Sequence, residues 1–188
     1  MNIAVLGGSF DPPHIGHYLV VKQIQELRPD IDKILLVPAF RHQWKQIQAS
    51  AKDRLAMTRY LIDGKVELSD MEIKRERGEY TIDTIRQLKK QIDARFYFIV
   101  GSDIIYEFDR WEKTEELIQL TTFLVFPRDP YHIPKTVPKG FELIQDKHLI
   151  TTNLSSTTIR DRIKNGKSIE HLVPKEIENY IIQHRLYR

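Results

Sequence analysis

Residues 3–17 read Ile-Ala-Val-Leu-Gly-Gly-Ser-Phe-Asp-Pro-Pro-His-Ile-Gly-His, and this stretch decides the fold. The apolar run 3–6 is typical of a buried parallel strand, and Gly7 and Gly8 let backbone approach a ligand closely. His14 and His17 open a segment whose apolar residues recur at helical spacing. Because free amides and the dipole at a helix start favour anions, the stretch predicts a phosphate-binding turn.

Other interpretations of this stretch stay open from the residues alone. The glycines could simply turn the chain. The histidines share a helix face and could be half of a metal site, although no further His or Cys lies nearby in the sequence. Asp11 could cap the turn, with Pro12 and Pro13 stiffening it.

Composition narrows the class of protein. The 188 residues suit one domain, 1–188, and the hydrophobic fraction of 41% and charged fraction of 29% are typical of globular proteins. The net charge of +3 and pI near 9.0 fit a polyanionic small molecule, and no long Lys/Arg block indicates nucleic-acid binding. Without cysteine there is no disulfide, thiol nucleophile or thiolate metal site. We find no signal or membrane segment and expect a cytoplasmic protein without a membrane partner.

Apolar runs alternate with helical patterns, which predicts a mainly parallel sheet with helices on both faces. A small helical part, 153–188, follows, with one helix ending near Asn165-Gly166 and one starting at Pro174. The expected strands are Asn2–Leu6, Lys33–Val37, Val66–Ser69, Phe96–Val100 and Phe123–Phe126; the expected helices are Gly16–Leu27, Ala51–Ile62, Thr81–Gln91 and Glu112–Leu120.

We expect three strands to end at the same crevice. Right-handed crossovers place the carboxyl ends of parallel strands at one edge, where ligands bind. The strands ending at Gly7, Gly101 and Pro127 should therefore face the same space. The proline-rich stretch Pro127–Lys139 is predicted to be a surface loop.

A second informative segment is Asn153-Leu154-Ser155-Ser156-Thr157-Thr158-Ile159-Arg160. Hydroxyls before a helix are commonly N-caps, which accounts for one or two of them. Arg160 lies about one turn further on, so its guanidinium could fork onto phosphate oxygens beside the helix amides.

The two segments together resemble the nucleotidyltransferase superfamily with a His-x-Gly-His signature and an Ile-Ser-Ser-Thr-x-x-Arg element. The resemblance implies a Rossmann-like open sheet of five to six strands. It also implies direct displacement at the α-phosphorus of ATP, with Mg²⁺ and without a covalent enzyme intermediate. His14, His17 and Arg160 are then catalytic, and the implied ATP-binding residues are Gly7, Gly8, Ser9, Phe10, Ser155, Ser156 and Thr157.

The middle of the chain resembles the nicotinate mononucleotide adenylyltransferase branch. Taken alone, Asp103 could cap a helix, Trp111 could pack in the core, and Thr81 could be an N-cap. In the resemblance, Gly101 and Asp103 line the ribose of ATP, Trp111 stacks on the pyridine ring, and Tyr80-Thr81 receives the pyridine carboxylate at a helix start.

One loop departs from the family pattern. Where the family has Pro-Pro-His-Lys, this chain has Pro38-Ala39-Phe40-Arg41-His42-Gln43-Trp44-Lys45. Lys45 occupies the lysine position, and Arg41 or His42 could replace the missing histidine. The resemblance assigns Lys45 to substrate binding.

The resemblance implies a nicotinate-nucleotide adenylyltransferase of NAD biosynthesis, with ATP and nicotinate mononucleotide as substrates and with neither nucleic acid nor membrane as partner. A transferase acting on nicotinamide mononucleotide or phosphopantetheine, a cytidylyltransferase, and a non-catalytic nucleotide sensor are the alternatives. A homo-oligomer stays open.

Overall fold

A computed structural model describes residues 1–41, 46–76, 80–134 and 136–188. Within these residues the strands are β1 (Asn2–Gly8), β2 (Lys33–Pro38), β3 (Val66–Leu68), β4 (Arg95–Gly101), β5 (Thr122–Phe126) and β6 (Phe141–Leu143). The helices are α1 (Ile15–Leu27), α2 (Ala51–Thr58), α3 (Met71–Lys74), α4 (Thr81–Gln91), α5 (Asp103–Glu107), α6 (Thr114–Leu120), α7 (Ser156–Lys164) and α8 (Lys175–Gln183), with the 3-10 turns η1 (Arg59–Leu61) and η2 (Phe108–Arg110).

The strands form one six-stranded open sheet in the order β3-β2-β1-β4-β5-β6, and every described pair is parallel. The predicted α/β Rossmann-like class is confirmed, with a wholly parallel sheet in the described residues. Strand order reverses at β1, which lies between β2 and β4. Open α/β sheets bind ligands outside the carboxyl ends of strands at such a switch point.

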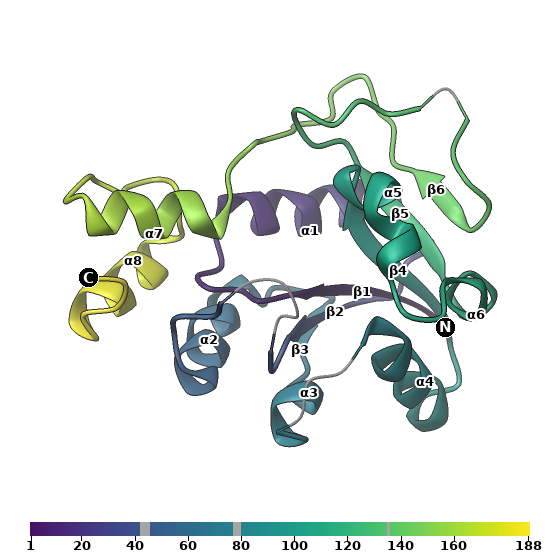
Figure 1. Cartoon of the computed structure of the whole chain (residues 1–188), viewed down its shortest axis with the longest axis horizontal. Coiled ribbons are helices and arrows are strands. Elements are labelled where there is room, and N and C mark those ends of the chain that lie inside the picture. Colours follow the sequence, from purple (N-terminus) through teal and green to yellow (C-terminus); the bar gives the residue numbers. More distant parts are fainter. Residues whose placement is uncertain (42–45, 77–79, 135) are drawn as a thin grey trace.

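Helices cover both faces of the sheet because the strands alternate their side chains. Ala4 and Leu6 of β1 belong to one core cluster, whereas Ile3 and Val5 belong to the other. The first cluster receives buried residues of α1, α2, α7 and α8, and the second receives those of α3, α4 and α6. Figure 1 shows α1 and α4 on opposite sides of β1.

The short elements are where prediction and structure differ. The expected helix 51–62 is divided into α2 and η1, and the expected helix 112–120 starts at Thr114 because Lys113 adopts a left-handed φ of 55°. The strand β6 and the single turns α3, α5 and η2 were not predicted. Elements of three to five residues are too short to show a hydrophobic period.

The C-terminal helices α7 and α8 lie at one end of the molecule (Figure 1). Ser156 of α7 donates to the carbonyl of Pro12 at 2.8 Å, and Tyr180 of α8 donates to Asp53 of α2 at 2.9 Å. The C-terminal part is thus packed against the segments that follow β1 and β2. Among the described helices, none has the length and apolar character needed to cross a membrane.

Candidate active site

A cavity of about 450 Å³ opens at the carboxyl ends of β1, β4 and β5. Gly7, Gly101 and Pro127 all line it, which confirms that these three strand ends face one space. The volume lies within the range of small-molecule sites, roughly 300–1,000 Å³.

The two histidines are built into the start of α1. His14 is the N-cap residue, and its Nδ1 accepts a hydrogen bond from the amide of Gly16 at 3.1 Å. The Nδ1 of His17 accepts from the amide of His14 at 3.2 Å. A ring nitrogen that accepts carries no proton, so each neutral imidazole holds its hydrogen on Nε2. Both rings line the cavity, and each therefore has one N–H donor for a ligand.

Burial keeps both imidazoles neutral. Desolvation, the neighbouring His17 and the Arg128 guanidinium lower the pKa of His14 far below its usual range. Desolvation and Arg128 lower the pKa of His17 to about 4. The ring centroids lie 3.9 Å apart, so two positive charges there would repel strongly. An anion between Arg128 and the rings would offset this repulsion.

The free energy of unfolding of the ligand-free protein should fall as the pH drops from about 6.5 to about 4. In the unfolded chain His17 takes up a proton near pH 6.5, whereas in the folded protein it stays neutral until about pH 4. The unfolded state therefore binds more protons in this window, which destabilises the fold. Urea titrations of the wild-type and His17→Asn proteins across this window provide the measurement. The variant should show the shallower pH dependence, and equal slopes would contradict the burial of a neutral His17.

Gly16 allows the His14 ring to lie against the helix start. A Cβ at this position would come within 2.9 Å of the His14 ring atoms and 3.2 Å of the Thr152 Cγ2. The glycine between the two histidines is thus a packing requirement of the imidazole pair.

Four of the five carbonyl oxygens in the turn 8–12 accept hydrogen bonds from neighbouring elements. A carbonyl that is already satisfied by a donor repels a phosphate less, so this arrangement favours an anion in the cavity. The donors are Ala39 N to Gly8 O, Arg54 Nη1 to Ser9 O, Arg160 Nη1 to Asp11 O and Ser156 Oγ to Pro12 O, each at 2.8 Å.

Asp11 does not cap its own turn. Its buried carboxylate accepts the amides of Gln48 at 2.7 Å and Ala49 at 2.9 Å, from the segment after β2. Phe10, next to it, adopts a φ of 49°, which is uncommon for a residue with a side chain. Such a conformation is held only where the surroundings determine it, and here the carbonyl bonds on both sides do so.

The hydroxyl groups at the start of α7 have two roles: one caps the helix, and the others bind neighbouring residues. Ser155 is the N-cap and accepts from the Thr158 amide at 3.1 Å, as the capping interpretation predicted. Ser156 binds the Pro12 carbonyl, and the Thr157 hydroxyl accepts from Arg160 Nη2 at 3.2 Å. Arg160 is thereby fixed at the cavity wall by both of its terminal nitrogens.

Asp103 lies directly after β4, where Gly101 gives it room. A Cβ on Gly101 would collide with the Asp103 carboxylate and come within 3.2 Å of the Arg128 side chain. Arg128 donates from Nη1 to Asp103 Oδ2 at 3.2 Å. Asp103 Oδ1 is buried with no hydrogen-bond partner in the described part of the chain, as are Trp111 Nε1 and Arg160 Nε. Buried polar groups are rarely left unsatisfied, so these cavity-lining residues point to a polar ligand.

Trp111, Tyr80 and Thr81 line another part of the same cavity. The rings of Phe98 and Phe123 meet the indole edge-on, at interplanar angles of 86° and 82°. Tyr80, not Thr81, is the N-cap of α4, and Thr81 is its first helical residue.

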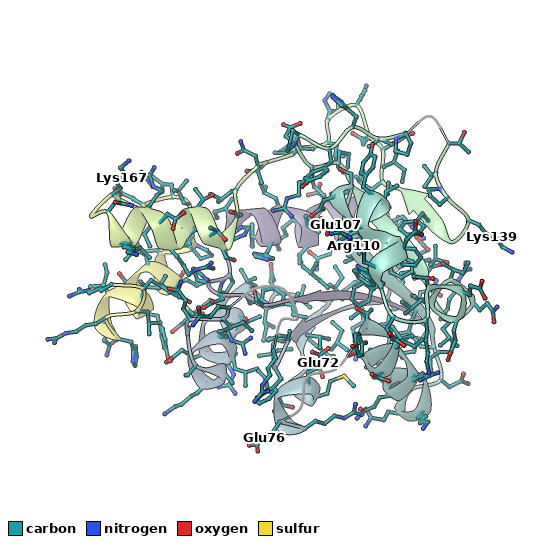
Figure 2. The ribbon with its side chains drawn as sticks, in the orientation of Figure 1. Glu72, Glu76, Glu107, Arg110, Lys139 and Lys167 are labelled. Carbon is teal, nitrogen blue, oxygen red and sulfur yellow. The ribbon has the colours of Figure 1, made fainter. Side chains whose placement is uncertain are left out.

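Charged side chains flank these residues. Glu72 extends from α3, and Glu107 and Arg110 extend from α5 and η2 (Figure 2). All three line the cavity, and the Thr84 hydroxyl donates to Glu72 at 2.5 Å.

The structure brings nearly all the sequence-predicted site residues to this cavity. Phe10 differs, because its side chain is fully buried and packs on His17 with ring centroids 4.9 Å apart. Lys45 lies outside the described residues. The predicted residues that line the cavity are Gly7, Gly8, Ser9, His14, His17, Tyr80, Thr81, Gly101, Asp103, Trp111, Ser155, Ser156, Thr157 and Arg160.

Sequence reasoning missed Arg128 and Arg54. Arg128 follows the predicted strand end at Pro127, and that position was its only signal. Arg54 is 1% exposed and binds the Ser9 carbonyl, but it belongs to an ordinary helical pattern of polar and apolar residues. Among the described residues no group of three or more His, Cys, Asp and Glu side chains is placed to hold a metal ion.

Comparison with known proteins agrees with this site. Residues 5–162 match the family model described as Cytidylyltransferase-like. A probable nicotinate-nucleotide adenylyltransferase of Halalkalibacterium halodurans is 38% identical, with 100% of this chain and 91% of the relative covered. Another, of Oceanobacillus iheyensis, is 35% identical, with 99% and 96% covered.

Solved structures give the same result. Plasmodium falciparum nicotinic acid mononucleotide adenylyltransferase complexed with NaAD is similar with a TM-score of 0.86 at 26% identity, covering 99% of this chain and 97% of that one. The same P. falciparum enzyme complexed with APC gives a TM-score of 0.83 at 25% identity, covering 99% and 96%. With full-length relatives above 30% identity and a matching family model, the chain belongs to the nicotinate-nucleotide adenylyltransferase family.

Proposed function

We propose that this protein is a nicotinate-nucleotide adenylyltransferase, which transfers AMP from ATP to nicotinate mononucleotide and releases pyrophosphate and deamido-NAD. The observation that carries the proposal is one cavity lined by two kinds of site. His14, His17 and Arg160 supply donors suited to a triphosphate, and Trp111 with the start of α4 supplies a surface suited to an aromatic acid. We also propose that the protein acts in the cytoplasm, where ATP is available.

The chemical step is an in-line displacement. A 5′-phosphate oxygen of the mononucleotide forms a bond to the α-phosphorus of ATP, and the bond from that phosphorus to the β-bridging oxygen breaks. The electron pair leaves with pyrophosphate. Such a reaction depends on positioning and charge stabilisation rather than on a nucleophilic side chain.

The donor half would stabilise the charge that develops on the phosphates. The Nε2–H groups of His14 and His17 are fixed by their Nδ1 bonds, so they would donate without prior reorganisation. Arg160 and Arg128 add permanent positive charge at the cavity wall. Asp103 Oδ1, which has no partner in the described residues, suits a ribose hydroxyl.

We further propose that Mg²⁺ enters with ATP. Mg²⁺ in phosphoryl-transfer sites is held largely by substrate phosphates and water. This fits a cavity whose described residues offer no cluster of acidic or histidine ligands. The ion would shield charge on the triphosphate, while His14, His17 and Arg160 would orient the triphosphate.

The acceptor half would hold the pyridine ring and its carboxylate. Trp111 lines the cavity, and its indole suits stacking with a flat, electron-poor ring, because three aromatic neighbours already hold it in place. The first-turn amides of α4, which begins at Thr81, favour a carboxylate over a neutral amide.

The direct test measures pyrophosphate release from ATP with nicotinate mononucleotide, nicotinamide mononucleotide or phosphopantetheine, and with CTP as donor. We expect the highest kcat/KM for ATP with nicotinate mononucleotide, and mass spectrometry should detect deamido-NAD. If ATP released no pyrophosphate with nicotinate mononucleotide and none with nicotinamide mononucleotide, the proposal would be overturned. Release only with another acceptor would assign the protein to a sister activity.

Replacing Trp111 with leucine should raise KM for nicotinate mononucleotide about tenfold or more, since stacking on an aromatic side chain contributes about 1–3 kcal/mol. KM for ATP should stay near the wild-type value, because the indole belongs to the acceptor half. Steady-state kinetics with each substrate varied in turn provide the measurement. An equal rise in both KM values would show that Trp111 supports the cavity as a whole rather than the acceptor.

A further inference from the structure

The carboxylate of Asp11 is a buried junction between distant segments. Asp11 is 1% exposed, and its carboxylate accepts the amides of Gln48 and Ala49. Its Oδ1 also accepts a hydrogen bond from the hydroxyl of Tyr187 at 2.9 Å. Arg160 Nη1 lies 3.8 Å from Oδ2 while donating to the Asp11 backbone carbonyl. One side chain, that of Asp11, thus joins four parts of the chain: the turn 8–12, the segment 48–49, α7 and residue 187.

Tyr187 is held in place for this contact. Its side chain is 9% exposed, its φ is 64°, and it belongs to the core cluster that includes Ile177 and Ile181 of α8. Burial and the adjacent Asp11 raise the pKa of the phenol well above its usual range, so the hydroxyl remains protonated and donates. A non-glycine residue in the left-handed region persists only where its surroundings fix it.

The junction connects two segments of the cavity wall. Asp11 contacts Arg160, a proposed triphosphate ligand, and also fixes the amides of Gln48 and Ala49. These amides lie just beyond Gln46 and Ile47, which line the cavity. A shift of the Asp11 carboxylate would therefore move Arg160 and the cavity-lining residues Gln46 and Ile47 together.

We propose that Tyr187 is a positioning residue, and this proposal rests on the function proposed above. Tyr187 acts through Asp11 and fixes the position of the phosphate-binding turn relative to the segment 46–49 during the transfer reaction. Tyr187 does not line the cavity in the described residues, so its effect is exerted through the Asp11 carboxylate. Removing its hydroxyl should impair turnover more than it impairs folding.

The chain offers a matched control in Tyr180. Its hydroxyl also donates to a carboxylate, Asp53 Oδ1, over the same 2.9 Å, and it also belongs to the C-terminal helical part. Asp53 and Tyr180 do not line the cavity in the described residues. Tyr180→Phe therefore removes a hydroxyl–carboxylate hydrogen bond of the same length, in a partly buried setting, without touching the junction.

Tyr187→Phe should lower kcat about tenfold or more, because small displacements of reacting groups cost up to about 10²-fold in rate. Tyr180→Phe should keep wild-type kcat and KM and should lower the thermal midpoint less, because its hydrogen bond is only partly buried. The two variants are compared by steady-state kinetics and by thermal denaturation followed by circular dichroism. Equal kinetics of the two variants would overturn the proposal.

Dependence on Asp11 is tested by a double-mutant cycle. If Tyr187 acts through the carboxylate, adding Tyr187→Phe to Asp11→Asn should change kcat little beyond the effect of Asp11→Asn alone. Fully additive losses would show that Tyr187 acts by another route and would overturn the proposal.

Hydrogen exchange supplies a readout that needs no turnover. The amides of Gln48 and Ala49 should exchange about tenfold faster in Tyr187→Phe, because the carboxylate that accepts them loses one of the bonds that orient it. The exchange rates of these amides should be unchanged in Tyr180→Phe. Unchanged rates in both Tyr187→Phe and Tyr180→Phe would overturn the proposal.

A second exchange experiment uses the wild-type protein. ATP should slow the exchange of both amides, which tests the coupling even if Tyr187→Phe does not fold. Absence of turnover in the wild-type protein would instead overturn the proposed function, leaving the exchange experiment to decide on Tyr187.

Discussion

Replacing His17 with asparagine is expected to lower kcat by about 10²–10³-fold, the usual loss when one fixed donor to a developing negative charge is removed. The asparagine oxygen reaches the position of Nδ1 and can still accept the His14 amide, which His17 does at 3.2 Å. The Nε2–H donor toward the cavity is lost. The helix start should therefore survive while charge stabilisation is removed, and single-turnover kinetics with saturating ATP measure the result.

His17→Gln is the complementary control. Its amide nitrogen reaches the position of Nε2, so it can donate to a phosphate, but it offers no acceptor at the Nδ1 position. We expect it to retain more activity than His17→Asn but to have a lower thermal midpoint, because the His14 amide loses its acceptor. If His17→Asn turned over at a near wild-type rate, the histidine would have no part in stabilising the transferred phosphate.

Replacing Gly16 with alanine is expected to reduce kcat/KM for ATP by about 10²-fold, the scale of loss that follows a displacement of about 1 Å. The new methyl would lie 2.9 Å from the His14 ring, so the imidazole must move and the Gly16 amide loses its acceptor. Alanine is intrinsically better than glycine inside a helix by roughly 0.5–1 kcal/mol, so the thermal midpoint should change much less than the activity.

The His14→Asn background tests this explanation. Without the imidazole there is no ring for the methyl to displace, so Gly16→Ala should add little to the loss caused by His14→Asn. Isothermal titration with ATP follows the affinity, and thermal denaturation follows the fold. Independent losses would mean that the methyl acts on Thr152 or the helix itself, not on the histidine.

The long elements of the fold were predictable from hydrophobic period. The strands at 2–6 and 96–100 and the helices at 16–27 and 81–91 have strong apolar patterns, and their bounds agree closely with the structure. β6 has three residues and follows a proline-rich loop, so no periodic signal marks it. The division of 51–62 into α2 and η1 is a local change of hydrogen-bond pattern, which side-chain periodicity does not register.

The roles of site residues were predictable where their contacts lie within a few positions of them in the sequence. His14, His17 and Ser155 serve helix starts, and their roles follow from spacing within one turn. The contacts of Asp11 with Gln48 and Tyr187 span 37 and 176 positions, and no local pattern specifies them. Phe10 was assigned to ATP from its place in a motif, but its ring is fully buried against His17.

The junction at Asp11 joins segments made at opposite times during translation. Asp11 leaves the ribosome early, whereas Arg160 and Tyr187 follow only after nearly all of the sheet. A nascent chain that stops short of α7 contains all six strands, but its phosphate-binding turn lacks the donors to the backbone carbonyls of Asp11 and Pro12. Incomplete chains, and chains clipped by a protease before residue 156, are therefore expected to fold in part yet leave ATP untouched.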